Sequence, residues 1–276
     1  MLDIVILHCI VIFGFKYIAG SRELKNPKSI MITGASSGIG RALAIEYAAP
    51  DVTLFISGQS EERLDESVQI CKRIGAKVFA EIIDCRNKQK MNEWITDCDR
   101  ITPLDLVIAN AGISTSFGAD DDISAHTESV FETNVGGVFN TVHPAIELMK
   151  KRRHGQIAIV SSVAGMRGLP SSPAYSTSKV AVKAYGEALR GYYYEYGLEI
   201  NVICPGFVRS RMTDENNFKM PFFMEAEKAA KIIRTGLEKN KTNITFPWQM
   251  RLITFAVRRI IPEFMLERIF RKLPKK

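Results

Sequence analysis

The chain has 276 residues, of which 46% are hydrophobic and 24% charged, which fits one folded domain and excludes disordered, collagen-like and disulfide-scaffold proteins. Its formal net charge is +7, but residues 248–276 hold eight basic and only two acidic side chains, so the rest of the chain carries +1. A nearly neutral body argues against a nucleic-acid-binding protein.

Residues 1–20 form an apolar N-terminal segment in which Asp3 and Lys16 flank the run 4–15. This length is marginal for a membrane-spanning helix, and the segment lacks the basic start of a cleavable signal peptide. It fits either a membrane anchor or a strand or helix packed on the domain. The basic residues that follow favour an anchor with the body on the cytoplasmic face, and otherwise the protein is cytoplasmic.

The five cysteines are scattered and form no CxxC pair, and the histidines form no metal-like pair, so no metal site is predicted. This pattern is typical of reduced thiols in a cytosol-facing protein.

From residue 28 onward, short β-branched runs alternate with amphipathic segments. The expected strands are residues 29–33, 52–57, 77–83, 105–109, 156–161, 199–204 and 243–246. The expected helices are 39–49, 61–74, 88–99, 125–150, 173–196 and 225–239. Regular alternation of apolar strands and helices predicts a single-domain α/β fold over 28–247, with a doubly wound (Rossmann) parallel sheet of seven strands.

A glycine-rich turn joins the first strand to the first helix, with the sequence Thr33-Gly-Ala-Ser-Ser-Gly-Ile-Gly40. Glycines there allow a ligand to approach the backbone closely, and the helix N-terminus offers free N–H groups and a positive dipole end. The turn therefore predicts a binding site for the pyrophosphate of a dinucleotide.

Six motifs in order along residues 28–247 resemble those of the classical short-chain dehydrogenases/reductases. They include the glycine turn, Asp84 after the third strand, Asn110-Ala-Gly112 after the fourth, and Pro205-Gly206 after the sixth. One departure is Ser210, which stands where a threonine is usual. The resemblance implies a cofactor-binding set of Thr33, Gly34, Ser36, Ser37, Gly38, Ile39, Gly40, Gln59, Ser60, Asp84, Asn110, Ala111, Gly112, Tyr175, Lys179, Pro205, Gly206, Val208 and Ser210.

Tyr175 and Lys179 are four residues apart, which on a helix places them on one face. A neighbouring ammonium lowers the pKa of a phenol, so Tyr175 is expected to act as a general acid/base. Ser162 ends the fifth strand, where parallel sheets bind ligands, and can stabilise charge on a substrate oxygen. Ser161 is the competing candidate, but the family's spacing favours Ser162. The resemblance adds Asn134 as the residue that holds a water in a proton relay, and implies the catalytic set Asn134, Ser162, Tyr175 and Lys179.

The function expected from these motifs is a reversible NAD(P)-dependent interconversion of a carbonyl and a secondary alcohol. The nicotinamide supplies the hydride, and the protein supplies position and a proton. The rival class is a catalytically silent nucleotide-binding regulatory protein, which would normally show a broken catalytic set.

Cofactor choice is read at the end of the second strand, where this chain has Ser57-Gly-Gln-Ser60. The acid that would bind the 2′-hydroxyl of NAD is missing, and so is the family's NADP-type arginine, in whose place Gln59 stands. Gln59, Ser60 and Arg41 could still bind a 2′-phosphate, so NADP(H) is favoured over NAD(H).

The segment after Pro205-Gly206 corresponds to the family's substrate-binding loop. It is rich in methionine and aromatic residues, namely Phe207, Met212, Phe218, Met220, Phe222, Phe223 and Met224. Such side chains form adaptable apolar walls and favour a lipophilic carbonyl or alcohol substrate, which leaves a membrane-associated ketolipid, sterol or retinoid reductase as a narrower alternative.

Residues 248–276 form an extension in which Pro262 divides two predicted helices. In the second, Met265, Leu266, Ile269, Phe270 and Leu273 share one face, and basic residues lie on the other. A basic amphipathic helix fits a membrane surface, and the other interpretation is an arm that covers the pocket or a dimer partner. Family members are often dimers or tetramers, so a homo-oligomer is also open.

Overall fold

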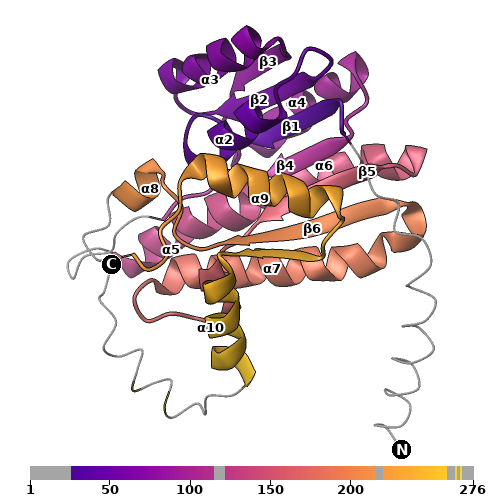
Figure 1. Cartoon of the computed structure of the whole chain (residues 1–276). Coiled ribbons are helices and arrows are strands. Elements are labelled where there is room, and N and C mark those ends of the chain that lie inside the picture. Colours follow the sequence, from indigo (N-terminus) through magenta and orange to yellow (C-terminus); the bar gives the residue numbers. More distant parts are fainter. Residues whose placement is uncertain (1–25, 115–121, 215–219, 260–264, 266–267, 269–276) are drawn as a thin grey trace, which may run out of the picture.

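The computed structural model describes residues 26–114, 122–214 and 220–259, together with residues 265 and 268. In this part of the chain, seven strands form one parallel sheet in the order β3-β2-β1-β4-β5-β6-β7 (Figure 1). The strands are β1 (Ser29–Thr33), β2 (Thr53–Gly58), β3 (Lys77–Ile82), β4 (Leu106–Ala109), β5 (Gly155–Val160), β6 (Leu198–Pro205) and β7 (Asn243–Phe246). The strand order reverses between β1 and β4, which confirms the predicted doubly wound fold.

The helices connect the strands and cover both faces of the sheet (Figure 1). They are α2 (Gly38–Tyr47), α3 (Glu61–Ile74), α4 (Lys88–Ile101), α5 (Ile123–Phe131), α6 (Gly137–Arg152), α7 (Pro173–Tyr192), α8 (Arg211–Asp214), α9 (Ala226–Glu238) and α10 (Trp248–Arg259). Two 3₁₀ turns, Val163–Met166 and Tyr194–Tyr196, flank α7.

The core has two layers because alternate side chains of a strand point to opposite faces. In β1, Ile30 and Ile32 pack with α2, α3 and α9, whereas Met31 lies in the layer formed with α4, α6 and α7. All three side chains are fully buried. Burial on both faces explains why the strands read as continuous apolar runs rather than as alternating ones.

The predicted helix over residues 125–150 is interrupted. A π-helical turn, Glu132–Gly136, separates α5 from α6. Pro144 lies inside α6 without ending it. The prediction over 173–196 was also too long, because α7 ends at Tyr192 and a left-handed residue, Gly197, then turns the chain into β6.

The two ends of the chain are only partly described. Residues 1–20, the predicted membrane anchor, lie outside the described residues, as does most of the second helix predicted after Pro262. The first helix of the C-terminal extension is α10. Within the residues that the structure describes, no helix combines the length and apolar character needed to cross a membrane.

Candidate active site

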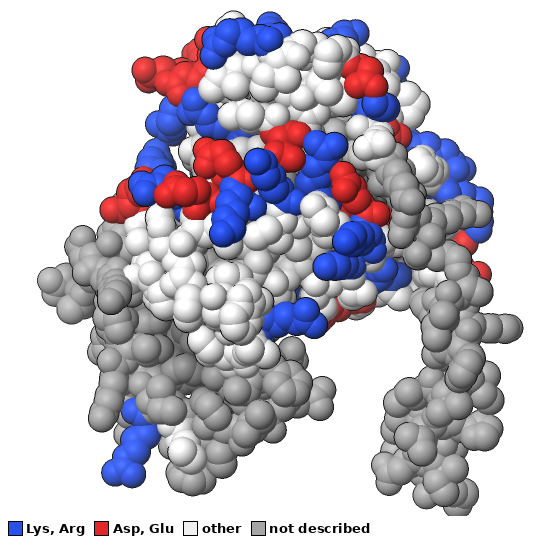
Figure 2. All heavy atoms as spheres, in the orientation of Figure 1, with Lys and Arg blue, Asp and Glu red and all other residues white. Residues whose placement is uncertain are grey.

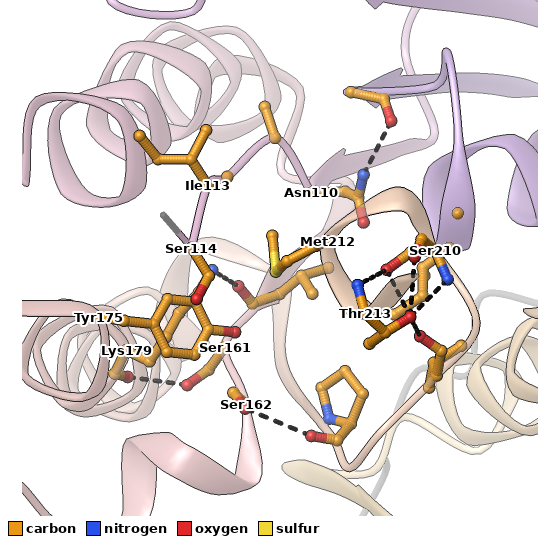
Figure 3. A pocket seen from close by; sticks show the side chains of 18 of the residues that line it. Asn110, Ile113, Ser114, Ser161, Ser162, Tyr175, Lys179, Ser210, Met212 and Thr213 are labelled. Carbon is orange, nitrogen blue, oxygen red and sulfur yellow. Dashed lines mark hydrogen bonds between the residues drawn. The ribbon is translucent and has the colours of Figure 1, made fainter. Parts of the chain in front are cut away.

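A cavity of about 940 Å³ opens at the carboxyl ends of the parallel strands, where such sheets bind their ligands. Figure 3 shows Ser162, Tyr175 and Lys179 at one side of it, and Asn110 and Ser210 at the other. Most of the predicted site residues line it, namely Thr33, Gly34, Ser36, Ser37, Gly38, Ile39, Gln59, Ser60, Asn110, Ala111, Gly112, Ser162, Tyr175, Lys179, Pro205, Gly206, Val208 and Ser210. Gly40, Asp84 and Asn134 do not line it.

The glycine turn has the shape that a pyrophosphate requires. Gly34 and Gly38 adopt φ values of +70° and +53°, which other residues rarely adopt. The side chain of Ser37 does not cap helix α2, and the first turn of this helix contains no acidic residue. The backbone N–H groups of this turn and the positive end of the helix are therefore available to an anion, and the turn fits a dinucleotide.

A set of hydrogen bonds ties this turn to the loop after β4. The Thr33 hydroxyl accepts from the backbone N–H of Asn110 (3.1 Å) and of Ala111 (3.2 Å). The Asn110 amide in turn donates to the carbonyl oxygens of Thr33 (2.9 Å) and Gly34 (3.2 Å), as seen at the top of Figure 3. The side chain of Asn110 thus holds the turn in shape, in addition to lining the cavity.

Two residues considered for the adenosine end are engaged elsewhere. Asp84 lies outside the cavity, and its carboxylate accepts from Arg86 Nε at 2.9 and 3.0 Å. These bonds from Arg86 hold the pKa of Asp84 below its usual value, despite partial burial. Arg41 pairs with Glu66 at 2.8 Å and does not line the cavity.

The structure separates the two candidate serines. Ser161 also lines the cavity, but its hydroxyl is occupied, because it donates to the backbone oxygen of Lys179 in α7 (2.7 Å; Figure 3). Ser162 lines the cavity, its Oγ accepts from the Ala164 N–H (3.1 Å) and lies 3.5 Å from the Pro205 carbonyl oxygen, and its side chain favours a lower pKa of Tyr175. Of the two serines, Ser162 is therefore the one whose hydroxyl faces the cavity together with the Tyr175 phenol.

The pKa of Tyr175 differs from the value expected for a phenol beside an ammonium group. Burial raises the pKa of Tyr175, and the hydrogen bond with Ser162 offsets only part of this increase. The ammonium of Lys179 lies 5.8 Å from the Tyr175 ring centroid and donates to the carbonyl oxygen of Val160 (3.0 Å). Desolvation thus outweighs the neighbouring charge, contrary to the expectation of a lowered tyrosine pKa, and the phenol stays protonated at neutral pH.

Asn134 lies behind the cavity wall, fully buried in the π-helical turn. Its amide oxygen accepts from the N–H of Ile113 (2.8 Å), and its nitrogen donates to the Ile113 oxygen (2.9 Å) and to Ser178 Oγ (3.0 Å). A Cβ at Gly112 would lie 3.0 Å from Asn134 Oδ1 and 3.2 Å from Lys179 Nζ, so both groups approach the same point of the loop. Asn134 thus holds the loop residue Ile113 and lies near the same glycine as Lys179.

The substrate end of the cavity is mainly apolar. Phe207 and Met212 line it as predicted, and Pro221 of the same segment lines it too, whereas Met224 is buried and Phe222 and Phe223 are exposed. Phe218 lies outside the described residues. Sequence reasoning missed Ile113, Val163, Met166, Leu169, Met250 and Ile253, which also line the cavity. Their apolar character gave no local signal, because only the fold brings η2 (Val163–Met166) and α10 to this place.

Lys179 makes the site costly for stability. Burial lowers its pKa from 10.5 to about 8. This shift means that keeping the ammonium charged lowers the free energy of unfolding by about 3 kcal/mol. A substitution that removes the ammonium would also lose its hydrogen bond to Val160, which offsets about 1 kcal/mol of the gain. We expect Lys179→Met to raise Tm at pH 7 by about 5 °C, measured by calorimetry. The gain should be complete below about pH 8 and vanish as the pH approaches 10.5, where neither the folded nor the unfolded chain carries the charge.

The matched control for this variant is Lys183→Met, one turn further along α7. Lys183 is also buried, but its ammonium pairs with Glu187 at 2.5 Å. Removing it takes this cation away from the Glu187 carboxylate, so this variant should lower Tm. Equal stabilisation by both variants would contradict the assigned cost of Lys179.

Comparisons with known proteins agree with this geometry. The family model for short chain dehydrogenases matches residues 28–220. An uncharacterized oxidoreductase of Myxococcus xanthus is 32% identical over 247 residues, which are 89% of this chain and 97% of the relative. Estradiol 17-beta-dehydrogenase 11 of Rattus norvegicus is 25% identical over 277 residues, which are 99% of this chain and 93% of that protein.

Among solved structures, levodione reductase has the same fold. Its TM-score is 0.71 at 24% identity, and the match covers 78% of this chain and 93% of that chain. Because the family model spans most of the chain and a relative at 32% identity covers nearly all of it, the chain belongs to the short-chain dehydrogenase family of NAD(P)-dependent oxidoreductases, which act on carbonyl and alcohol groups.

Proposed function

We propose that the protein reduces a lipophilic ketone or aldehyde with NADPH, and oxidises the corresponding alcohol in reverse. The observation that carries this proposal is the convergence of Ser162, Tyr175 and Lys179 on the cavity that begins at the glycine turn. A catalytically silent regulatory protein would have no need for a buried lysine beside a tyrosine that lines the cavity.

In the proposed reaction, Tyr175 donates its proton to the substrate oxygen, and Ser162 donates a hydrogen bond to the same oxygen as negative charge develops on it. The nicotinamide cofactor, when bound, supplies the hydride. The raised pKa of Tyr175 keeps the phenol protonated, which suits the direction of reduction. Lys179 returns a proton to the phenol, and Asn134 holds a water in the proton relay that leads to Lys179.

NADP(H) is preferred in this proposal because the end of β2 presents no carboxylate to the cavity. Gln59 and Ser60 occupy the positions that face the adenosine ribose in this fold. An acidic residue there would repel a 2′-phosphate, and its lack removes the main barrier to NADP(H).

The apolar lining at the substrate end supports a lipophilic substrate. Met166, Leu169 and Met212 provide flexible walls, and Met250 and Ile253 of α10 extend them toward the cavity mouth. The relative named as an estradiol 17-beta-dehydrogenase acts on such a molecule, which favours the same substrate class here.

An activity screen tests the proposed reaction. Purified protein is assayed with NADPH and with NADH against ketones of rising chain length and against steroid and retinoid carbonyls. We expect turnover with NADPH that rises with the apolar area of the substrate. Cofactor binding without turnover on any carbonyl would favour the silent regulatory protein, and a preference for short polar ketones would contradict the lipophilic substrate.

We also propose that α10 docks the enzyme on a lipid surface. Trp248, Leu252 and Ile253 expose 66, 58 and 47% of their surface, and Ile253 lines the cavity as well. Charged side chains gather along α9 in Figure 2, whereas the area below it, toward α10, is mainly uncharged. An apolar patch beside the cavity mouth would let a lipophilic substrate pass from the membrane to the site.

Vesicle flotation tests this docking with the full chain. We expect the wild type to float with vesicles of phosphatidylcholine and phosphatidylserine, and Leu252→Glu to reduce the bound fraction severalfold because the charge must leave water. The control is Ile101→Glu, which places the same charge on a residue that is 47% exposed on α4. Equal binding of both variants would exclude α10 as the docking element, and a wild type that stays in solution would exclude docking itself.

A further inference from the structure

The charged side chains that line the cavity, among the described residues, are all basic. Among the described residues that line it, no aspartate or glutamate is present, and the basic ones are Arg63, Arg167, Lys179 and Arg211. Lys179 belongs to the catalytic group, and Arg167 and Arg211 lie among the substrate-side segments. Arg63 is different, because it stands in the first turn of α3, directly after the Gln59-Ser60 segment that follows β2.

The environment of Arg63 is that of a cation without a counter-ion. Its Nε is buried and has no hydrogen-bond partner, and no carboxylate in the described part of the chain forms an ion pair with it. The neighbouring arginines are paired, Arg41 with Glu66 and Arg86 with Asp84. A desolvated donor that stays unpaired costs stability unless a ligand satisfies it.

The groups beside Arg63 suit a phosphate. Ser36, Gln59 and Ser60 line the cavity as well, and Ser36 lies beside the end of β2, since a Cβ at Gly58 would be 3.1 Å from Ser36 Oγ. Ser60 is the N-cap residue of α3, and its hydroxyl makes no capping bond, so it is available to a ligand. The acidic residues of this turn, Glu61 and Glu62, are exposed and do not line the cavity. A guanidinium presents a planar pair of donors that matches phosphate oxygens.

We propose that Arg63 binds the 2′-phosphate of NADP(H) and thereby takes over the role of the arginine that Gln59 replaces. The inference rests on the proposed preference for NADP(H) and assigns that preference to one side chain. Because Arg63 lies in the first turn of α3, the 2′-phosphate would be bound by a side chain of α3 and not by the residue at the end of β2. Ser36 and Ser60 would complete the phosphate site with their hydroxyls.

Binding titrations separate this role from a general contact with adenosine. The dissociation constants of 2′,5′-ADP, 5′-AMP, NADPH and NADH are measured by calorimetry for the wild type and for Arg63→Ala. We expect Arg63→Ala to weaken 2′,5′-ADP and NADPH by about 10- to 100-fold, the effect of losing charged hydrogen bonds, and to leave 5′-AMP and NADH within about twofold. Arg63→Lys, which keeps the charge without the planar fork, should lie between the two.

Two further variants serve as controls. Arg73→Ala removes an exposed arginine at the far end of the same helix and should change none of the four constants. Arg41→Ala removes the arginine that pairs with Glu66 and should also preserve the ratio between 2′,5′-ADP and 5′-AMP. Thermal melting of each variant in the same buffer confirms that the fold is kept.

The outcomes distinguish the inference from the proposed function. A wild type that binds NADH as tightly as NADPH would overturn the cofactor preference and with it the role of Arg63. If the wild type prefers NADPH and Arg63→Ala keeps that preference, only the assignment of Arg63 is wrong. An equal loss for 2′,5′-ADP and 5′-AMP would mean that Arg63 stacks on adenine instead, which also overturns it.

Discussion

Replacing Tyr175 with phenylalanine is expected to lower kcat for carbonyl reduction by about 10³-fold, the range typical of a lost general acid. The phenol lines the cavity together with Ser162, and burial raises its pKa, so that it is protonated at neutral pH. Its ring remains in Tyr175→Phe, so the cavity wall is kept and the dissociation constant for NADPH should stay within about twofold of the wild-type value. Stopped-flow reduction and fluorescence titration measure the two quantities.

The control for this variant is Tyr192→Phe, at the end of the same helix. The side chain of Tyr192 is 69% exposed and lies outside the cavity, so the loss of its hydroxyl should leave kcat unchanged. Turnover by Tyr175→Phe at the rate of Tyr192→Phe would remove Tyr175 from the proposed mechanism.

Gly40→Ala is expected to disable the glycine turn. A Cβ at this position would lie 2.3 Å from the Gly34 carbonyl oxygen and 2.5 Å from the Asn110 amide nitrogen. Neither group can move without breaking the bonds that hold the turn, so we expect the free energy of unfolding to fall by about 3 kcal/mol, as in other overpacked sites. The affinity for NADPH should fall at least about tenfold, since the phosphate-binding backbone would be displaced. Denaturant titration and calorimetry provide the measurements.

Gly191→Ala is the matched control for this steric effect. Gly191 lies near the end of α7, and a Cβ there would meet no atom within 4 Å. Because alanine favours the helix over glycine, this variant should be more stable by about 0.5 kcal/mol. If Gly40→Ala also kept wild-type stability, the close packing described at the turn would be refuted.

The sheet could be predicted from the sequence because strands buried on both faces are apolar at every position. Runs such as Ile30-Met-Ile32 and Leu54-Phe-Ile56 are apolar at every position, and each is followed by a turn and an amphipathic helix. All seven strands were found, with ends that differ by one residue or by none. The strand ends are decided by individual hydrogen bonds, which composition does not report.

The break in the predicted helix 125–150 could not be foreseen in this way. The π-helical turn around Asn134 depends on hydrogen bonds with Ile113 and Ser178, which are distant in sequence. Local propensity gives no clear signal here, because Gly136 and Gly137 lie at the break whereas Pro144 lies inside α6 without breaking it. Tertiary contacts at a site residue thus override the local pattern, as is common for π turns.

The electrostatics of the site were likewise beyond the sequence. The spacing of Tyr175 and Lys179 indicates that they share a helix face, but not that burial raises the phenol's pKa or that the ammonium bonds to Val160. Arg63 was missed for a related reason. It lies beyond the strand-end positions that the motif identifies, and only the start of α3 brings it to the cavity.

The bonds that join Thr33 to Asn110 have a consequence for how such an enzyme can evolve. They continue along the loop after β4 through Ile113 and Asn134 to Ser178, whose hydroxyl donates to the Tyr175 carbonyl oxygen at 2.7 Å. A continuous set of hydrogen bonds therefore joins the glycine turn to helix α7, and these bonds do not include the side chains of Gln59, Ser60 or Arg63. In the proposed function, selection can exchange NADP(H) for NAD(H) by substituting Gln59, Ser60 or Arg63, and leave the alignment of Ser162 and Tyr175 intact.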